Sequence, residues 1–143
     1  MEEVEALMQM NRWALCTLGI GPDAGTGHAG SSHIAFIPPG TSPDQGMMFV
    51  PLDHATRYVA HPRCPENYYE YGMTVGPATL ALAQKHLVVA MGPHKPMNVA
   101  DTLLGKCDLN RGSSHHTQLF PNVHWLLDQE AAEELERRLF SQK

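Results

Sequence analysis

Three short apolar runs constrain the fold of this chain more than any other feature of its sequence. They cover residues 13–18, 87–91 and 123–127, and each ends in a glycine or acidic break. Continuous apolar runs of this length, separated by helix-like segments, are typical of buried parallel strands. We therefore predict that the three segments are parallel strands of one sheet, with carboxyl ends that face a common crevice.

One helix is predicted after the second run. Pro96 fits the first helical position, because the N–H group that proline lacks would have no partner there in any case. Met97, Ala100 and Leu104 then fall on one face of the helix, and Gly105 is placed to end it.

Another helix is predicted after the third run, over residues 129–140. Asp128 is a suitable N-cap, and the acidic residue near the start and the basic residues near the end suit the helix dipole. Ala132, Leu135 and Leu139 are spaced to form its buried stripe.

The rest of the chain predicts one short helix and one long loop. The helix should begin at Pro77 and run to about Gln84, and residues 21–46 hold many of the Gly, Pro and Ser residues. A loop that long inside a compact domain is usually functional or disordered. Strands alternating with helices indicate an α/β fold, and 143 residues suit a single domain over residues 1–143.

The composition argues against several classes of function. The sequence has 15 acidic and 10 basic residues and no basic cluster, so we expect no nucleic-acid partner. No apolar run is long enough to span a bilayer, and the acidic start lacks the pattern of a signal peptide. Cys16, Cys64 and Cys107 are widely spaced and odd in number, which fits free thiols. We therefore expect a cytoplasmic protein without a membrane partner.

The nine histidines are more than usual, but none has the spacing of a specific metal site. We therefore predict neither a metal site nor a cofactor. His115 and His116 follow a polar stretch at residues 111–114 and are predicted to lie in a surface loop.

Two segments resemble the signature of a known enzyme family. Residues 19–23 (Gly-Ile-Gly-Pro-Asp) and 33–36 (His-Ile-Ala-Phe) resemble the signature G-x-G-x-D-G-H-I-A-F-N-E-P of the glucosamine-6-phosphate deaminase/isomerase family, in a superfamily that includes 6-phosphogluconolactonase. Four further segments resemble family elements in the same order: residues 53–57, 73–80, 92–95 and 118–122. The resemblance covers the C-terminal half of the family domain only.

The resemblance implies a three-layer, Rossmann-like parallel sheet and a function tied to a phosphorylated amino sugar. Family members convert glucosamine 6-phosphate to fructose 6-phosphate and ammonia, which requires one base to open the sugar ring, another to move the C2 proton, and cations to hold the phosphate. The resemblance assigns ring opening to His33, oriented by Asp23, and phosphate binding to Arg57 and Lys95. We predict that Arg57 and Lys95 approach one anion, beside a helix start that also favours it.

The chain departs from the family pattern around the signature histidine. Ile37 and Pro38 stand where the signature has Asn-Glu, so one carboxylate is missing. Residues 24–32 separate the aspartate from the histidine, where the family has a single glycine. His28 is a second candidate for the signature histidine, although the Ile-Ala-Phe that follows His33 makes His33 the better match.

No segment resembles the N-terminal half of the family domain, which supplies a phosphate loop and the aspartate that abstracts the C2 proton. The family's sheet would need strands from that half, because an unpaired parallel edge is a liability. We therefore expect a homo-oligomer, a partner chain that supplies the missing half, or an origin as a fragment. Three functions stay open: a deaminase/isomerase homologue, a sugar-phosphate-binding domain without turnover, and a 6-phosphogluconolactonase-like hydrolase.

Overall fold

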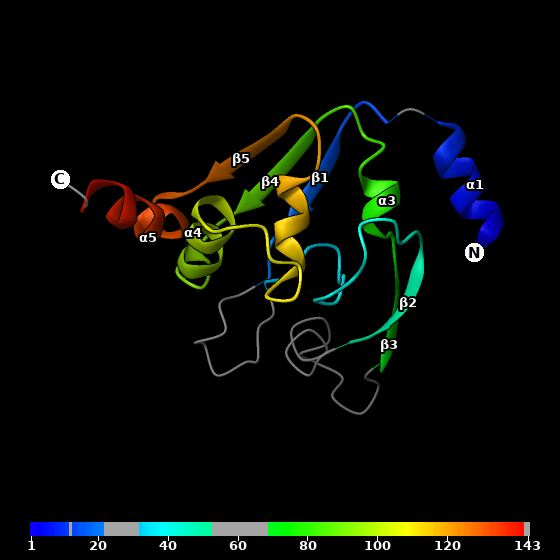
Figure 1. The fold of residues 1–143 in the computed structure, drawn as a ribbon, viewed down its shortest axis with the longest axis horizontal. Coiled ribbons are helices and arrows are strands. Elements are labelled where there is room, and N and C mark those ends of the chain that lie inside the picture. Colours follow the sequence, from blue (N-terminus) through cyan, green and yellow to red (C-terminus); the bar gives the residue numbers. More distant parts are fainter. Residues whose placement is uncertain (12, 22–31, 53–68, 142–143) are drawn as a thin grey trace.

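The computed structural model describes residues 1–11, 13–21, 32–52 and 69–141, and Figure 1 shows their arrangement. In chain order the helices and strands are α1 (Glu2–Met10), β1 (Cys16–Gly19), β2 (Met48–Pro51), β3 (Tyr71–Thr74), α3 (Pro77–Leu80), β4 (His86–Ala90), α4 (Pro96–Leu104), the 3₁₀ helix η3 (Ser113–Gln118), β5 (Val123–Leu127) and α5 (Gln129–Phe140).

β1, β4 and β5 form a parallel sheet with β4 in the centre (Figure 1). Leu18 lies opposite Val88, which lies opposite Trp125. The predicted sheet and α/β fold class are confirmed, although the first strand begins at Cys16 rather than at Trp13. Because the strands are parallel, their carboxyl ends lie at one edge of the sheet.

One face of this sheet is covered by helices. Alternate residues of the strands are buried there, in two clusters that also contain side chains from the covering layer. The first cluster includes Leu18, Val88, Leu80 of α3 and Phe120. The second includes Ile20, Ala90, Val99 of α4 and Ala131 of α5.

The other face of the sheet carries no helix among the described residues. Thr17 and Gly19 are exposed on it, Leu87 and Val89 are half-buried, and Leu126 is 52% exposed. Among the described residues, a Cβ atom added at Gly19 would meet no atom within 4 Å beyond its chain neighbours. The described residues therefore supply two layers of the expected three.

β2 and β3 form a separate antiparallel pair next to α1 and α3 (Figure 1). The carboxylate of Glu5 in α1 accepts hydrogen bonds from the Met47 amide, at 3.0 Å, and from the Thr79 hydroxyl of α3, at 3.3 Å. A Cβ atom at Gly46 would lie 1.8 Å from this carboxylate, so a larger residue there would displace the Glu5 side chain from its present position. Glu5 therefore connects α1 to the start of β2 and to α3.

Most of the predicted helix ends are confirmed. α4 begins at Pro96, and Gly105 follows its last residue. α5 begins after Asp128, whose carboxylate accepts a hydrogen bond of 2.8 Å from the Ala131 amide, as expected of an N-cap. The short helix α3 begins at Pro77 but ends at Leu80, earlier than predicted.

The predicted buried faces of two helices are partly wrong. In α5 the fully buried residue is Ala131, and Leu139 is 51% exposed. In α4, Met97 and Leu104 are 47% and 44% exposed. α4 packs between the sheet, α5 and η3, so its buried surface is wider than one stripe and includes small and polar side chains. The buried residues of α4 are Asn98, Val99, Ala100 and Thr102.

None of the described helices is long and apolar enough to cross a membrane. Cys16 is a buried free thiol, whose pKa is raised by burial, and Cys107 is an exposed one. Cys64 lies outside the described residues.

Candidate functional site

Two side chains from the start of α4 reach the carboxyl end of β1. The Lys95 ammonium group donates a hydrogen bond of 2.6 Å to the carbonyl of Ile20, and the Asn98 amide donates one of 3.1 Å to the carbonyl of Gly21. This is the edge at which open α/β sheets bind ligands. The sequence predicted Lys95 here and missed Asn98, although its place in the first turn of a predicted helix was an available signal.

His33 lies at the same end of β1. Its carbonyl accepts a hydrogen bond of 2.7 Å from the Gly21 amide, and the next residue, Ile34, forms an isolated antiparallel bridge with Ile20. The half-buried imidazole lies against Phe36, with ring centroids 6.0 Å apart. The structure thus brings two predicted site residues, His33 and Lys95, to the same short stretch of backbone.

The turn after His33 explains one departure from the family signature. Ala35 and Phe36 have positive φ angles of 48° and 58°, and the Ile37 amide donates a hydrogen bond of 2.8 Å to the Ile34 carbonyl. Both Ile34 and Ile37 are fully buried in the core. Where the signature has a polar residue, this chain therefore uses an apolar anchor.

Asp23 and Arg57 lie outside the described residues, as does His28. The pairing of Asp23 with His33, and the joint approach of Arg57 and Lys95 to an anion, stay predictions.

Asp128 supports the turn that leads to Lys95. Its two carboxylate oxygens accept hydrogen bonds from the Gly92 amide at 3.1 and 2.9 Å, in addition to the bond from Ala131. Gly92 has a φ angle of +87°, a conformation that glycine adopts without strain. One carboxylate therefore caps α5 and fixes the turn between β4 and α4.

The prediction of a surface loop at His115 and His116 is wrong. Both residues lie in η3 and are only 2% and 0% exposed. The His116 ring nitrogens contact the carbonyls of Ser113 and Thr41 at 2.9 and 3.0 Å, whereas Nδ1 of His115 has no partner among the described residues. The segment is buried through hydrogen bonds rather than apolar side chains, so its polar composition concealed its position.

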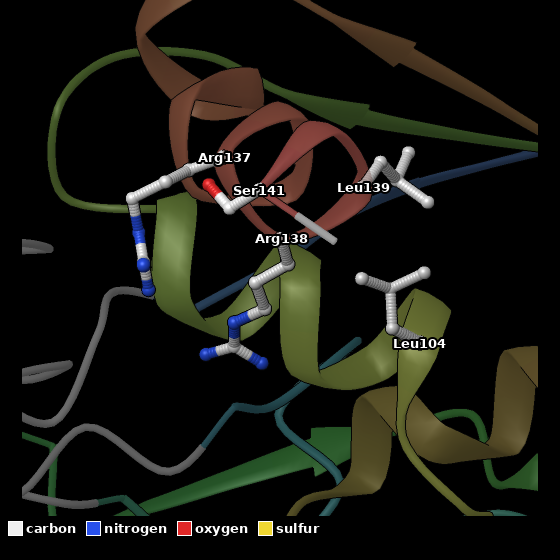
Figure 2. Close-up of a pocket in the computed structure, with 5 residues that line it drawn as sticks. All are labelled: Leu104, Arg137, Arg138, Leu139 and Ser141. Carbon is white, nitrogen blue, oxygen red and sulfur yellow. The ribbon is translucent and has the colours of Figure 1, made fainter. Parts of the chain in front are cut away.

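A shallow pocket of about 410 Å³ lies at the other end of α4 (Figure 2). Its lining residues are Leu104, Arg137, Arg138, Leu139 and Ser141. Both arginines donate hydrogen bonds to Glu134. These bonds lower the pKa of Glu134 to about 2, and the bond from Arg137 has the largest effect. Both cationic groups of this pocket are paired with carboxylates of the protein. No group of three or more potential metal ligands occurs in the part of the chain that the structure describes.

Comparison with known proteins relates this geometry to a family. Neither a protein-family model nor a curated protein matches the sequence. Among solved structures, a monomeric glucosamine-6-phosphate deaminase, described as a missing link of the NagB superfamily, matches with a TM-score of 0.78 and 26% identity over 93% of this chain. The chain has the fold of half a glucosamine-6-phosphate deaminase. It spans 53% of that protein's length.

Two less similar structures extend the comparison. A 6-phosphogluconolactonase from Trypanosoma brucei matches with a TM-score of 0.54, 23% identity, and coverage of 85% of this chain and 42% of the other. A devB protein matches with a TM-score of 0.59, 17% identity, and coverage of 94% and 52%. The resemblance to this superfamily, over about half of the length of its members, is confirmed.

Proposed function

We propose that this chain binds a phosphorylated amino sugar at the carboxyl ends of β1 and β4, as a relative of glucosamine-6-phosphate deaminase. The observation that carries the proposal is the convergence of Lys95 and His33 on the backbone of Ile20 and Gly21. The higher similarity to the deaminase than to the lactonase favours an amino sugar.

Each residue has a role that suits its chemistry. Lys95 lies at the start of α4, where the helix dipole adds to the attraction for a phosphate. Arg57 supplies a second cation, and bidentate contacts of arginine with phosphate are strong and directional. His33 is the group that opens the sugar ring, with Asp23 to hold its tautomer.

These 143 residues are proposed to bind rather than to turn over the sugar phosphate. The resemblance assigns no residue of this sequence to the abstraction of the C2 proton, and Pro38 replaces the carboxylate of the signature. Positioned proton transfer contributes about 10²–10⁴-fold to a rate, and the isomerisation requires it twice. Binding needs only the cations and the helix start.

Calorimetry with glucosamine 6-phosphate tests the binding. Lys95→Ala removes a charged hydrogen-bond donor worth about 1.5–3 kcal/mol, so the affinity should fall about tenfold to a hundredfold. Lys85→Ala is the matched control. Lys85 is exposed and directly precedes β4, at the end of the strand opposite to Lys95. Absence of binding in the wild type, or equal affinities of both variants, would refute the proposal.

An ammonia-release assay on the same preparation tests turnover. We expect negligible release from the chain alone. Family-like turnover that disappears in His33→Ala would show that the chain contains a second base. Hydrolysis of 6-phosphogluconolactone without binding of the amino sugar would instead favour the lactonase alternative.

A further inference from the structure

The main chain around His33 is held by hydrogen bonds on both sides. Before His33, the carbonyl of Ser32 accepts a hydrogen bond of 2.8 Å from the Ser114 amide. After it, the amide of Ile34 donates one of 3.1 Å to the Ser113 hydroxyl. Both partners lie at the start of η3, about 80 residues further along the chain.

A chain of hydroxyl groups continues from Ser32 to α4. The Ser32 and Ser114 hydroxyl oxygens are 2.6 Å apart, and those of Ser114 and Thr102 are also 2.6 Å apart. Ser114 has one hydroxyl hydrogen, so it donates to one neighbour and accepts from the other. Ser114 and Thr102 are fully buried, where each such bond is stronger than in water and costly to leave unmade.

The backbone of η3 is itself fixed closely against this segment. A Cβ atom at Gly112 would lie 2.8 Å from the carbonyl oxygen of Ser32, so any other residue would push the two segments apart. The ring of His116 in η3 also contacts the carbonyl of Thr41, so η3 is joined to a second segment of the chain. Such packing leaves little freedom to the residues that contact Ser32 and Ile34.

We propose that Ser113 and Ser114 are positioning residues for His33. They fix the main chain on both sides of the histidine. The hydrogen bond between Ser114 and Thr102 joins this segment to α4. Lys95 directly precedes this helix, so one element sets the place of the imidazole and of the ammonium group relative to each other. A role of these residues in catalysis rests on the proposed function, whereas their hydrogen bonds to the segment around His33 do not depend on it.

NMR of the ligand-free protein tests the proposal. In Ser114→Ala, which removes both hydroxyl contacts, the resonances of the His33 ring should shift and its NOE with the Phe36 ring should weaken or disappear. In Ser113→Ala, the Ile34 amide loses a bond worth about 0.5–1.5 kcal/mol, so its hydrogen exchange should accelerate about twofold to tenfold.

Thr79→Val is the matched control, because Thr79 is a fully buried hydroxyl that bonds to Glu5, away from η3. It should leave the His33 signals unchanged. The resonances of His86, whose ring nitrogens contact the carbonyls of Pro121 and Leu80, report in each spectrum that the core is intact.

A folded Ser114→Ala variant with the His33 spectrum of the wild type would overturn the proposal. If Ser114→Ala does not fold, Ser32→Ala removes only the outer contact of the chain and must produce the same shift. Because no sugar phosphate is present, a negative calorimetric result on the proposed function would leave this test unaffected.

Discussion

The two faces of the β1–β4–β5 sheet differ in what covers them. On one face, Leu18 and Val88 are 7% and 0% exposed beneath the helices. On the other face, one position further along the register, Val89 is half-buried and Leu126 is 52% exposed. The same strands therefore contribute to a packed core on one side and to an open apolar surface on the other.

The sequence of the central strand, β4, is suited to burial on both faces. β4 carries Leu87 and Val89 on the open face and Val88 on the covered face, and strands of this kind normally lie between two layers of helices. The described residues supply one of these layers. We therefore expect a further helical layer over Leu87 and Val89, from a second copy, a partner chain, or another part of a longer protein to which these residues belong.

Leucine-to-alanine substitutions on the two faces give the largest contrast. Leu18→Ala on the covered face should lower the free energy of unfolding by about 3 kcal/mol, because it leaves a cavity. Leu126→Ala on the open face should lower it by less than about 0.5 kcal/mol. Urea denaturation measures both.

Equal losses in the two variants would contradict an open face in solution. A self-associated protein would give that result, and sedimentation would then show a mass above 15.8 kDa for the wild type. Leu126→Lys should in that case return the mass to that of the monomer.

Two glycines, one in a crowded place and one on the open face, allow a steric comparison with smaller expected effects on stability. Gly76 precedes α3, and a Cβ atom there would lie 2.0 Å from the Gly46 carbonyl oxygen. Gly76→Ala should therefore destabilise the fold by about 1–3 kcal/mol. Gly19→Ala on the open face should be neutral or stabilise it by up to about 1 kcal/mol, because glycine weakens a strand. A lower melting temperature of Gly19→Ala would show that something already covers this face.

Features with a local or periodic signal were predictable from the sequence. The apolar runs predicted β1, β4 and β5, Pro96 marked the start of α4, and Asp128 marked the start of α5. In each case neighbouring residues determine the structure, through strand burial, a missing N–H group or a side-chain cap.

Features that depend on long-range hydrogen bonds were not predictable. The contacts of Ser113 and Ser114 with the segment around His33 join residues about 80 positions apart, and nothing in a polar stretch before two histidines distinguishes it from a surface loop. At the candidate site, the sequence placed His33 and Lys95 at one edge, but only through a family resemblance. Asn98 has no motif of its own.

Two histidines, one buried in the covering layer and one exposed on the open face, allow a comparison of how stability depends on pH. Burial lowers the pKa of His115, which lies in the covering layer, from its ordinary value of 6.5. The unfolded chain therefore binds more protons than the folded one, so stability is complete above about pH 6.5 and is lost as the pH falls towards the lowered pKa. The loss should be about 1.4 kcal/mol for each unit by which the pKa is lowered.

Urea denaturation at pH 5 and pH 8 measures this dependence. His115→Gln should reduce the difference between the two values. His124→Gln, at an exposed position on the open face, should retain the wild-type difference. An unchanged difference in His115→Gln would show that another group causes the acid sensitivity.

Ion pairs within the covering layer should have the smallest effect. Arg138 of α5 donates to Asp101 of α4 and to Glu134 of its own helix, whereas Arg137 donates, among the described residues, to Glu134 alone. Exposed pairs contribute about 0.2–1 kcal/mol and are screened by salt. We expect Arg138→Ala to cost about 1 kcal/mol at low ionic strength and Arg137→Ala to cost less, because of the two only Arg138 joins two helices. Both losses should shrink in 0.5 M salt, whereas the loss in Leu18→Ala should persist, since apolar burial is not screened. A loss in Arg138→Ala as large as that in Leu18→Ala would mean that charge pairing, rather than apolar contact, holds the helices on the sheet.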